Sequence, residues 1–271
     1  MRSKLVYIVF IVSALTAAAQ TTKRNFKQRE LGVLLGGSYY IGDLNTFKHF
    51  IYSKPAAGIF FRYTTNYRYA FRFGFNYGNI AASDKQSANP DQLQRDANFQ
   101  SDIYEFSGIA EFNFVEYRIG HNKHYFTMFI FAGLSGFHFN PKGNLNQGAG
   151  WQSLQPMRTE GQSKSYALEQ VSIPFGVGFK YNVWDFMGIG FEWGPRKTFT
   201  DYIDDVSGLY PDPKTNSPIG NGLSYSYRGG FAGDRVGTMR GNPRTKDWYF
   251  FYGLTLNFKI LTARGPCYRE L

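Results

Sequence analysis

Apolar and polar residues alternate with a period of two through long stretches of the chain. Residues 68–80, RYAFRFGFNYGNI, show the pattern best: every second position is aromatic (Tyr69, Phe71, Phe73, Phe75 and Tyr77). The positions between them hold Arg, Ala, Gly and Asn. Because successive side chains of a β-strand point to opposite faces, this stretch is predicted to be a strand with one aromatic face and one small or charged face.

The same alternation recurs along the chain and predicts eight strands. They lie at about residues 30–40, 55–64, 68–80, 102–116, 124–139, 169–182, 186–199 and 247–260. Most exceed the roughly 5–6 residues of a usual strand and reach the about 9–11 residues that a tilted strand needs to cross a bilayer. Residues 124–139 are apolar on both faces, so their orientation stays open.

The predicted connections alternate in length. Short links (TNYR, YRIGHNKH and VWDF) follow the second, fourth and sixth strands, and each other link is longer. Outer-membrane barrels combine short periplasmic turns with long outer loops in this way. We therefore predict an all-β fold, an eight-stranded antiparallel up-and-down transmembrane β-barrel over residues 30–260, and take a soluble β-sandwich as the alternative.

Charges of both signs occupy the positions predicted to face inward. They are Arg62, Arg68, Arg72, Lys180 and Lys259, and Glu105, Glu111, Glu192 and Asp247. The interior of an eight-stranded barrel is just wide enough for side chains to fill it. An isolated buried charge costs several kcal/mol, so these groups are expected to pair. The pattern predicts a side-chain-filled lumen, a plug rather than a pore.

The two ends of the chain are predicted to lie in the periplasm. Residues 1–19 combine a basic start, a short apolar run and an Ala-x-Ala site, which is typical of a cleaved signal peptide. Its removal lowers the formal net charge by Arg2 and Lys4, from +10 to +8. The remaining basic balance favours anionic lipid or an acidic protein partner over nucleic acid after export.

Two terminal segments are candidates for binding a partner. Residues 20–29 carry Lys23, Arg24, Lys27 and Arg29, and the tail 261–271 carries Arg264, Cys267 and Tyr268. The basic segment could complement an acidic surface, or it could be a solvated terminus. Cys267 is the only cysteine, so an internal disulfide is excluded.

One acidic stretch, TFTDYIDDVSG at residues 198–208, raises the question of a metal or catalytic site. It contains Asp201, Tyr202, Asp204 and Asp205, and the predicted topology puts it at the start of the longest outer loop. The spacing differs from that of an EF-hand, so a solvated or capping role is favoured over a Ca²⁺ site. Whether the loop folds over or into the barrel mouth is left open.

The sequence holds none of the common hydrolase, phosphate-loop or zinc-protease motifs, and no cofactor is expected. His121 and His124 have metal-like spacing but lie in a predicted turn, where two ligands are too few. Ser135 and His138 are three residues apart on one predicted strand, so they point to opposite faces and make a poor nucleophile–base pair.

Three motifs resemble known outer-membrane proteins. YGLTLNF, Tyr252 to Phe258, is similar to the assembly signal of outer-membrane barrels, although 13 residues follow it. GGSYYIGDLN, residues 36–45, together with TFTDYIDDVSG resembles the PorG family of Bacteroidetes outer-membrane proteins, a part of the type IX (Por) secretion machinery.

That resemblance implies a non-enzymatic barrel that docks to or stabilises the periplasmic ring proteins of the type IX translocon. Two other functions remain open: an OmpA-like structural or adhesive surface barrel, and an outer-membrane lipid-modifying enzyme. All three place the protein in the outer membrane, in contact with its lipid.

Overall fold

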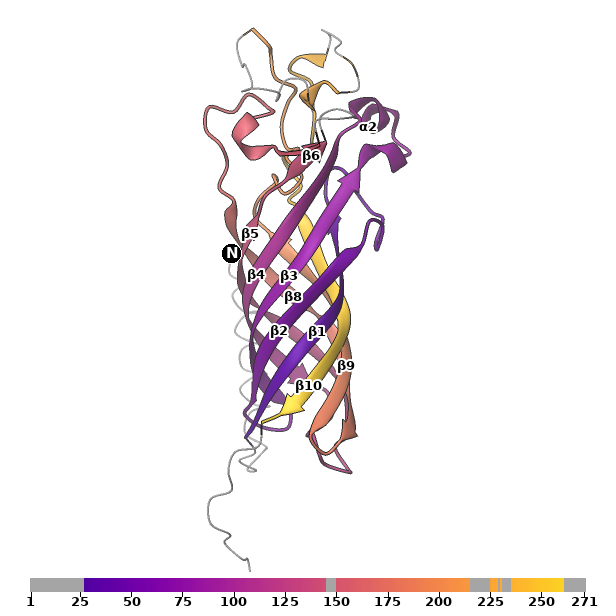
Figure 1. The fold of residues 1–271 in the computed structure, drawn as a ribbon, viewed down its shortest axis with the longest axis vertical. Helices are drawn as coiled ribbons and strands as arrows, with labels where there is room; N and C mark the ends of the chain where they lie inside the picture. The colour runs from indigo at the N-terminus through magenta and orange to yellow at the C-terminus, as the bar shows by residue number, and fades with distance from the viewer. Residues whose placement is uncertain (1–26, 145–149, 215–224, 229, 231–234, 261–271) are drawn as a thin grey trace, which may run out of the picture.

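The computed structural model describes residues 27–144, 150–214, 225–228, 230 and 235–260. Its eight long strands form the barrel shown in Figure 1. They are β1 (Gln28–Ile41), β2 (Lys54–Thr64), β3 (Tyr69–Ser83), β4 (Asn98–Asn113), β5 (Phe126–Phe139), β8 (Glu169–Trp184), β9 (Met187–Thr198) and β10 (Trp248–Lys259). Each of the eight predicted ranges overlaps one of these strands.

The barrel is closed and antiparallel throughout. Each long strand pairs with the next long strand along the chain, and β1 pairs with β10 from Glu30↔Lys259 to Ile41↔Trp248. Closure removes the unpaired edge that an open sheet would leave, which is what a strand protein in lipid requires. The prediction of an eight-stranded up-and-down barrel is confirmed.

Several short helices and strands lie at the end of the barrel that carries the long loops. They are the 3-10 helix η1 (Asp84–Gln86), helix α2 (Pro90–Arg95), the hairpin β6 (Lys142–Asn144) and β7 (Trp151–Ser153), and the 3-10 helix η2 (Gln155–Met157). The hairpin extends the sheet beside β4 through the pair Gln100↔Lys142. Its strands are too short to show a period of two, so sequence periodicity did not predict them.

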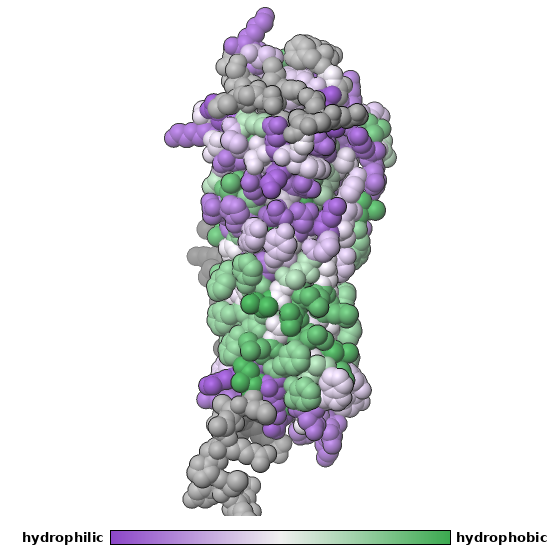
Figure 2. All heavy atoms as spheres, in the orientation of Figure 1, coloured by the Kyte–Doolittle hydropathy of each residue, from purple (hydrophilic) through white to green (hydrophobic). Residues whose placement is uncertain are grey.

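The outer wall is apolar over only part of its height. On β3, Phe71, Phe73 and Phe75 are exposed, whereas Arg72 between them is buried. Figure 2 shows a hydrophobic band around the half of the barrel nearer the short turns and a hydrophilic surface around the other half. An apolar belt of this kind is the lipid-facing surface of an outer-membrane barrel, so the strands project beyond it on the long-loop side. Within the described residues, no helix is both long and apolar enough to span a membrane.

The strand with two apolar faces, β5, has its orientation settled by packing. Phe129, Phe131, Phe137 and Phe139 are buried inside the barrel, and Met128 and its outward neighbours are exposed. The inward Phe rings fill the lumen beside cationic groups: the Lys180 ammonium lies 4.3 Å from the Phe129 ring centre. A buried cation on an aromatic face is stabilised by the negative potential of that face.

Glu111 on β4 is the centre of the ion-pair network in the lumen. Its carboxylate lies 2.6 Å from Lys180 Nζ, 2.9 Å from Arg62 Nε and 3.2 Å from Arg72 Nε. All four side chains are buried. One carboxylate alone cannot neutralise three cations, so the network has to extend to further acids.

The two arginines make that extension to either side of the lumen. Arg62 Nη1 donates to Glu30 at 2.8 Å, and Arg72 Nη1 lies 2.5 Å from Glu192. Higher in the lumen, Glu105 pairs with Arg196 at 3.0 Å and accepts a hydrogen bond from the Tyr249 hydroxyl at 2.8 Å. Glu30 and Arg196 belong to the network although the strand pattern did not identify them as lumen residues.

Three residues predicted for the lumen network lie elsewhere, and these predictions were wrong. Arg68 is exposed in the β2–β3 turn and donates to the Phe114 carbonyl at 3.3 Å. Lys259 is the last residue of β10 and is only half-buried at the barrel end. Asp247 precedes β10 and is buried under the outer loops instead. A period of two assigns a side chain to a face, but it does not show where the strand leaves the barrel.

We predict that Glu111→Gln destabilises the barrel by roughly 3–5 kcal/mol, because it leaves three buried cations without their common anion. Unfolding by urea in lipid vesicles measures the loss. Glu169→Gln removes the same charge from an exposed side chain and should change stability by less than about 1 kcal/mol. A Glu111→Gln loss no larger than that of Glu169→Gln would show that the network does not hold the lumen together.

Candidate functional site

The acidic stretch 198–208 enters the barrel mouth. Ile203 and Val206 are fully buried and pack in one apolar cluster with Tyr40, Tyr249 and other residues at the top of the lumen. Asp204 and Asp205 have no exposed surface. Of the predicted solvated or capping role, the solvated part is therefore wrong for Asp204 and Asp205, because the apolar residues beside them anchor the loop inside. Asp204 does accept from the backbone amide of Val206 at 3.0 Å, as a capping carboxylate would.

Asp204 and Asp247 share one tyrosine hydroxyl. Tyr40 Oη lies 2.6 Å from Asp204 Oδ2 and 2.7 Å from Asp247 Oδ1. A tyrosine hydroxyl has a single proton to donate, and an ionised carboxylate can only accept. One of the two aspartates must therefore carry a proton for both contacts to be hydrogen bonds. In agreement, burial and the neighbouring charge of Asp247 raise the pKa of Asp204 well above its ordinary value.

Asp205 ties two outer loops together. It accepts hydrogen bonds from Thr159 Oγ1 at 2.5 Å and from the Tyr166 hydroxyl at 2.7 Å, both on the β5–β8 connection. Burial raises the pKa of Asp205 to about 7, although the guanidinium of Arg240 opposes this shift. Arg240 itself pairs with Glu160 at 2.9 Å, and Glu160 accepts from the backbone amides of 207 and 208.

Arg95, at the end of α2, joins three loops. It makes a two-pronged ion pair with Asp84, with both contacts at 2.7 Å. It also donates to the backbone carbonyls of Arg240 at 2.6 Å and Asp43 at 3.1 Å. A guanidinium that makes two hydrogen bonds to one carboxylate fixes the relative orientation of the two side chains. We call the outer loops joined in this way the cap, defined by residues 42–53, 84–97, 140–168 and 199–247 in their described parts.

The three aspartates of the acidic stretch do not converge on a common point. Asp201 accepts from Ser207 Oγ at 2.7 Å, whereas Asp204 and Asp205 turn to the separate partners given above. Among the described residues, no group of three or more His, Cys, Asp or Glu is arranged to hold a metal ion. His121 and His124 face each other in the short turn after β4, with ring centres 4.5 Å apart.

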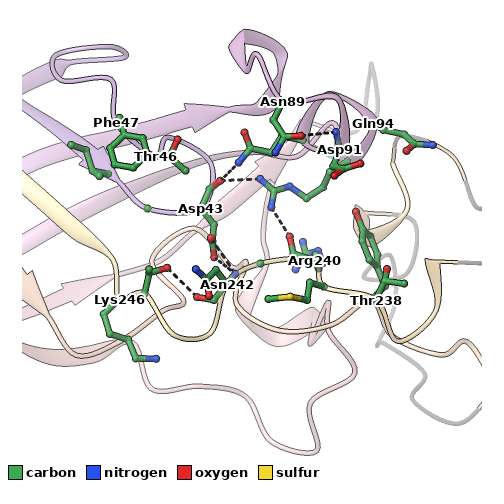
Figure 3. Close-up of a pocket in the computed structure, with 18 of the residues that line it drawn as sticks. Asp43, Thr46, Phe47, Asn89, Asp91, Gln94, Thr238, Arg240, Asn242 and Lys246 are labelled. Carbon is green, nitrogen blue, oxygen red and sulfur yellow. Dashed lines mark hydrogen bonds between the residues drawn. The ribbon is translucent and has the colours of Figure 1, made fainter.

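A pocket of about 910 Å³ opens among the loops of the cap, next to the outer ends of β1 and β10 (Figure 3). The β1–β2 loop, α2 and residues 235–248 line it. Asp43 stands at its centre, and its carboxylate accepts from the Asn242 amide at 3.0 and 3.2 Å. Asn89 Oδ1 accepts from the Asp91 amide at 2.9 Å and so caps the start of α2. The sequence did not reveal this pocket, because its walls come from loops far apart in the chain.

The predicted partner-binding residues are only partly described. Lys27 and Arg29 are exposed at the start of β1, at the short-turn end of the barrel. Lys23, Arg24, Arg264, Cys267 and Tyr268 lie outside the described residues. Tyr202 stacks on Tyr166 with ring centres 4.6 Å apart and so adds to the contact between the cap loops.

Comparison with known proteins identifies a family without an assigned function. A family model described as "Domain of unknown function (DUF6089)" matches residues 2–222. No curated protein matches the chain.

Solved structures to which the chain is similar at low identity include three outer-membrane barrel proteins. Ail, the attachment invasion locus protein of Yersinia pestis, in complex with the heparin analogue sucrose octasulfate, is 12% identical, with 86% of this chain and 99% of that chain covered and a TM-score of 0.42. The N-terminal β-barrel domain of Pseudomonas aeruginosa OprF is 11% identical, with 87% and 100% covered and a TM-score of 0.36. Neisserial surface protein A is 8% identical, with 88% and 98% covered and a TM-score of 0.37.

We predict that the cap loosens as the pH rises. The folded cap raises the pKa of Asp201 to about 6 and that of Asp205 to about 7, so both groups bind protons more tightly folded than unfolded. Their contribution to stability is complete below about pH 4 and is lost as the pH rises through 6 and 7.

Hydrogen exchange of the amides of residues 203–206, corrected for the intrinsic pH dependence, measures this effect. Protection should fall between pH 5 and pH 8. Asp205→Asn, which cannot ionise, should flatten the change. Equal protection at both pH values would contradict the prediction.

Proposed function

The chain belongs to the DUF6089 family, and we propose that it is a non-enzymatic outer-membrane component of the type IX secretion machinery that docks to or stabilises the periplasmic translocon ring. The observation that carries the proposal is a contact. The two motifs that resemble the PorG family, residues 36–45 and 198–208, meet at the barrel mouth. The Tyr40 hydroxyl and the Asp204 carboxyl, 164 positions apart in the sequence, share a hydrogen bond of 2.6 Å, and the Leu44 amide lies 3.3 Å from the same carboxyl group. The two motifs thus form one structural unit, which supports treating them as a single family signature.

The closed lumen supports a docking role over a transport role. Buried ion pairs around Glu111 fill the barrel interior, and the cap enters its mouth. The surfaces left for function are the lipid-facing belt, the cap and the short-turn end. In barrels of this kind the short turns face the periplasm, so we place both termini there, on the side of the proposed ring.

The basic start of β1 is the surface we propose for the dock. Lys27 and Arg29 are exposed there, and Lys23 and Arg24 precede them in the sequence. Four cations within seven residues suit an acidic partner surface, because complementary charge speeds association and selects the partner. β10 also finishes at this end of the barrel, and the tail with Arg264, Cys267 and Tyr268 follows it in the sequence.

An OmpA-like structural or adhesive surface barrel is the second candidate, and the pocket among the cap loops favours it, because it could hold a ligand at the cell surface. Its volume falls in the range of small-ligand sites, roughly 300–1,000 Å³. A lipid-modifying enzyme has less support. Ser135 is buried and shares a hydrogen bond with Ser172 at 2.7 Å, whereas the His138 ring faces Glu169 on the exposed side. These two side chains do not form a nucleophile–base pair.

The docking proposal predicts that Lys27→Glu combined with Arg29→Glu lowers recovery of ring proteins at least tenfold in a native pull-down from outer membranes. It should also reduce export of proteins that bear the C-terminal sorting domain. The reason is that two cations become repulsive toward an acidic partner. The matched control is Arg244→Glu with Lys246→Glu, the same charge change at the opposite end of the barrel, and it should leave recovery unchanged. Normal export from a strain lacking the protein would refute the secretion role.

A further inference from the structure

The β1–β2 loop folds back onto the outer wall of the barrel. The Phe50 ring lies 5.0 Å from that of Tyr39 and 5.1 Å from that of Tyr252, and the His49 ring lies 5.5 Å from that of Phe250. Phe50 and Tyr52 adopt positive φ angles of 62° and 57°. Bulky residues rarely take this conformation, so the contacts of the loop with the wall must hold these two residues in it.

This loop presents apolar rings to the surroundings of the barrel. The Phe47 side chain is 86% exposed, and Phe50 is 52% exposed even with its contacts to the wall. A soluble loop would gain nothing by exposing both rings. Aromatic residues in these positions are typical of the interface between membrane and water, where amphipathic segments lie against the head groups.

The strand register sets the height of the loop above the apolar belt. Phe50 contacts Tyr252, which pairs with Gly37 across the β1–β10 seam. Two residues along each strand toward the short turns, Leu254 pairs with Leu35, and both leucine side chains face the outside of the barrel. Both leucines are more than half exposed, at 61% and 55%. Two residues along a tilted strand rise by roughly 5 Å, so Phe50 stands about one head-group layer above the lipid-facing leucines.

The pocket among the cap loops is lined in part by this β1–β2 loop. Thr46 and Phe47 belong to both, and Trp248 at the start of β10 forms the part of the pocket nearest the wall. Trp248 lies six residues before Leu254 on β10, so it faces the same side of the strand and lies nearer the cap. The pocket therefore faces the layer just outside the membrane, where the sugar head groups of outer-leaflet glycolipids stand.

Positive charge gathers on the outer side of this pocket. The exposed Lys246 lines it, and the exposed Lys197 on β9 lies with its Nζ 5.9 Å from the Trp248 ring centre. Arg235 also lines the pocket, with its guanidinium 5.5 Å from the Tyr210 ring centre. Of the two acids that line the pocket, Asp43 is buried and hydrogen-bonded to Asn242, which leaves Asp91 as the exposed one. This balance suits a ligand that carries phosphate.

The remaining lining suits the hydroxyl groups of a sugar. Thr46, Gln94, Thr238 and Thr245 are exposed and offer hydroxyl and amide groups. Such groups both donate and accept, as a polyhydroxylated ligand requires. The exposed Phe47 ring adds an apolar face at the edge. Size, charge and polarity thus agree on one class of ligand.

We propose that this pocket binds the phosphorylated sugar head group of an outer-leaflet glycolipid, whose acyl chains lie along the wall at Leu35 and Leu254. Lys246 contacts the phosphate, the hydroxyl and amide side chains contact the sugar, and Phe47 rests at the boundary between head group and chain. The proposal does not depend on the translocon role, because it uses the opposite end of the molecule.

The test uses the full-length protein in detergent and measures its retention of lipopolysaccharide against phosphatidylglycerol. We expect the wild-type protein to retain lipopolysaccharide at least tenfold better. Phe47→Ser combined with Lys246→Gln should abolish this preference. Lys123→Gln, which removes one charge in a short turn at the other end, is the control and should leave it intact.

Three results would overturn the proposal. They are equal retention of phosphatidylglycerol, an unchanged preference in the double variant that still runs as a folded barrel on gels, and equally tight binding of the lipid-free core oligosaccharide, which would assign the pocket to a free glycan. Recovery of ring proteins with the double variant separates this test from that of the secretion role, because it should match the wild-type recovery.

Discussion

The lumen of this barrel encloses charges that water cannot reach in bulk, and the structure depends on how they are neutralised. Glu111 forms ion pairs with Arg62, Arg72 and Lys180. Arg62 also pairs with Glu30 and Arg72 with Glu192, so three carboxylates balance the three cations. Breaking such a set leaves an uncompensated buried charge, which is far more costly than the net contribution of any single pair. The buried ion pairs therefore require one arrangement of side chains in the lumen. Any binding function is expected on the outer surfaces of the barrel.

Buried charged and polar groups of the cap are also paired with one another, as in the lumen. Glu105 and Tyr249 connect the lumen to its mouth, and Tyr40 links β1 to Asp204 in the long β9–β10 loop. Arg95 and Arg240 then hold the loops to one another through buried acids and backbone carbonyls. The described cap loops hold one another in place, because their buried polar groups find partners in neighbouring loops. The same loops line the pocket, so these contacts also set its shape.

Sequence periodicity was enough to predict the barrel but not the cap. Strands such as β3 and β10 carry their faces in the residue pattern, since lipid selects apolar side chains at every second position. The pattern also assigned Arg68 and Lys259 to the lumen, although both lie where the strands end. The cap depends on contacts such as Arg95 with Asp84 and Asp205 with Thr159, which join separate loops without any period. Only Ile203 and Val206, apolar residues among carboxylates, signalled that this acidic loop is buried.

A lumen that is filled and closed cannot conduct ions, and electrical conductance across a planar bilayer tests this most directly. The full-length protein, inserted with its loops intact, is predicted to show no stable channel, because the Glu111 ion pairs lie in the lumen and the described part of the cap enters its mouth. A large, stable conductance from the folded wild-type protein would contradict the account, since it would require the ion-pair network to be open in the membrane.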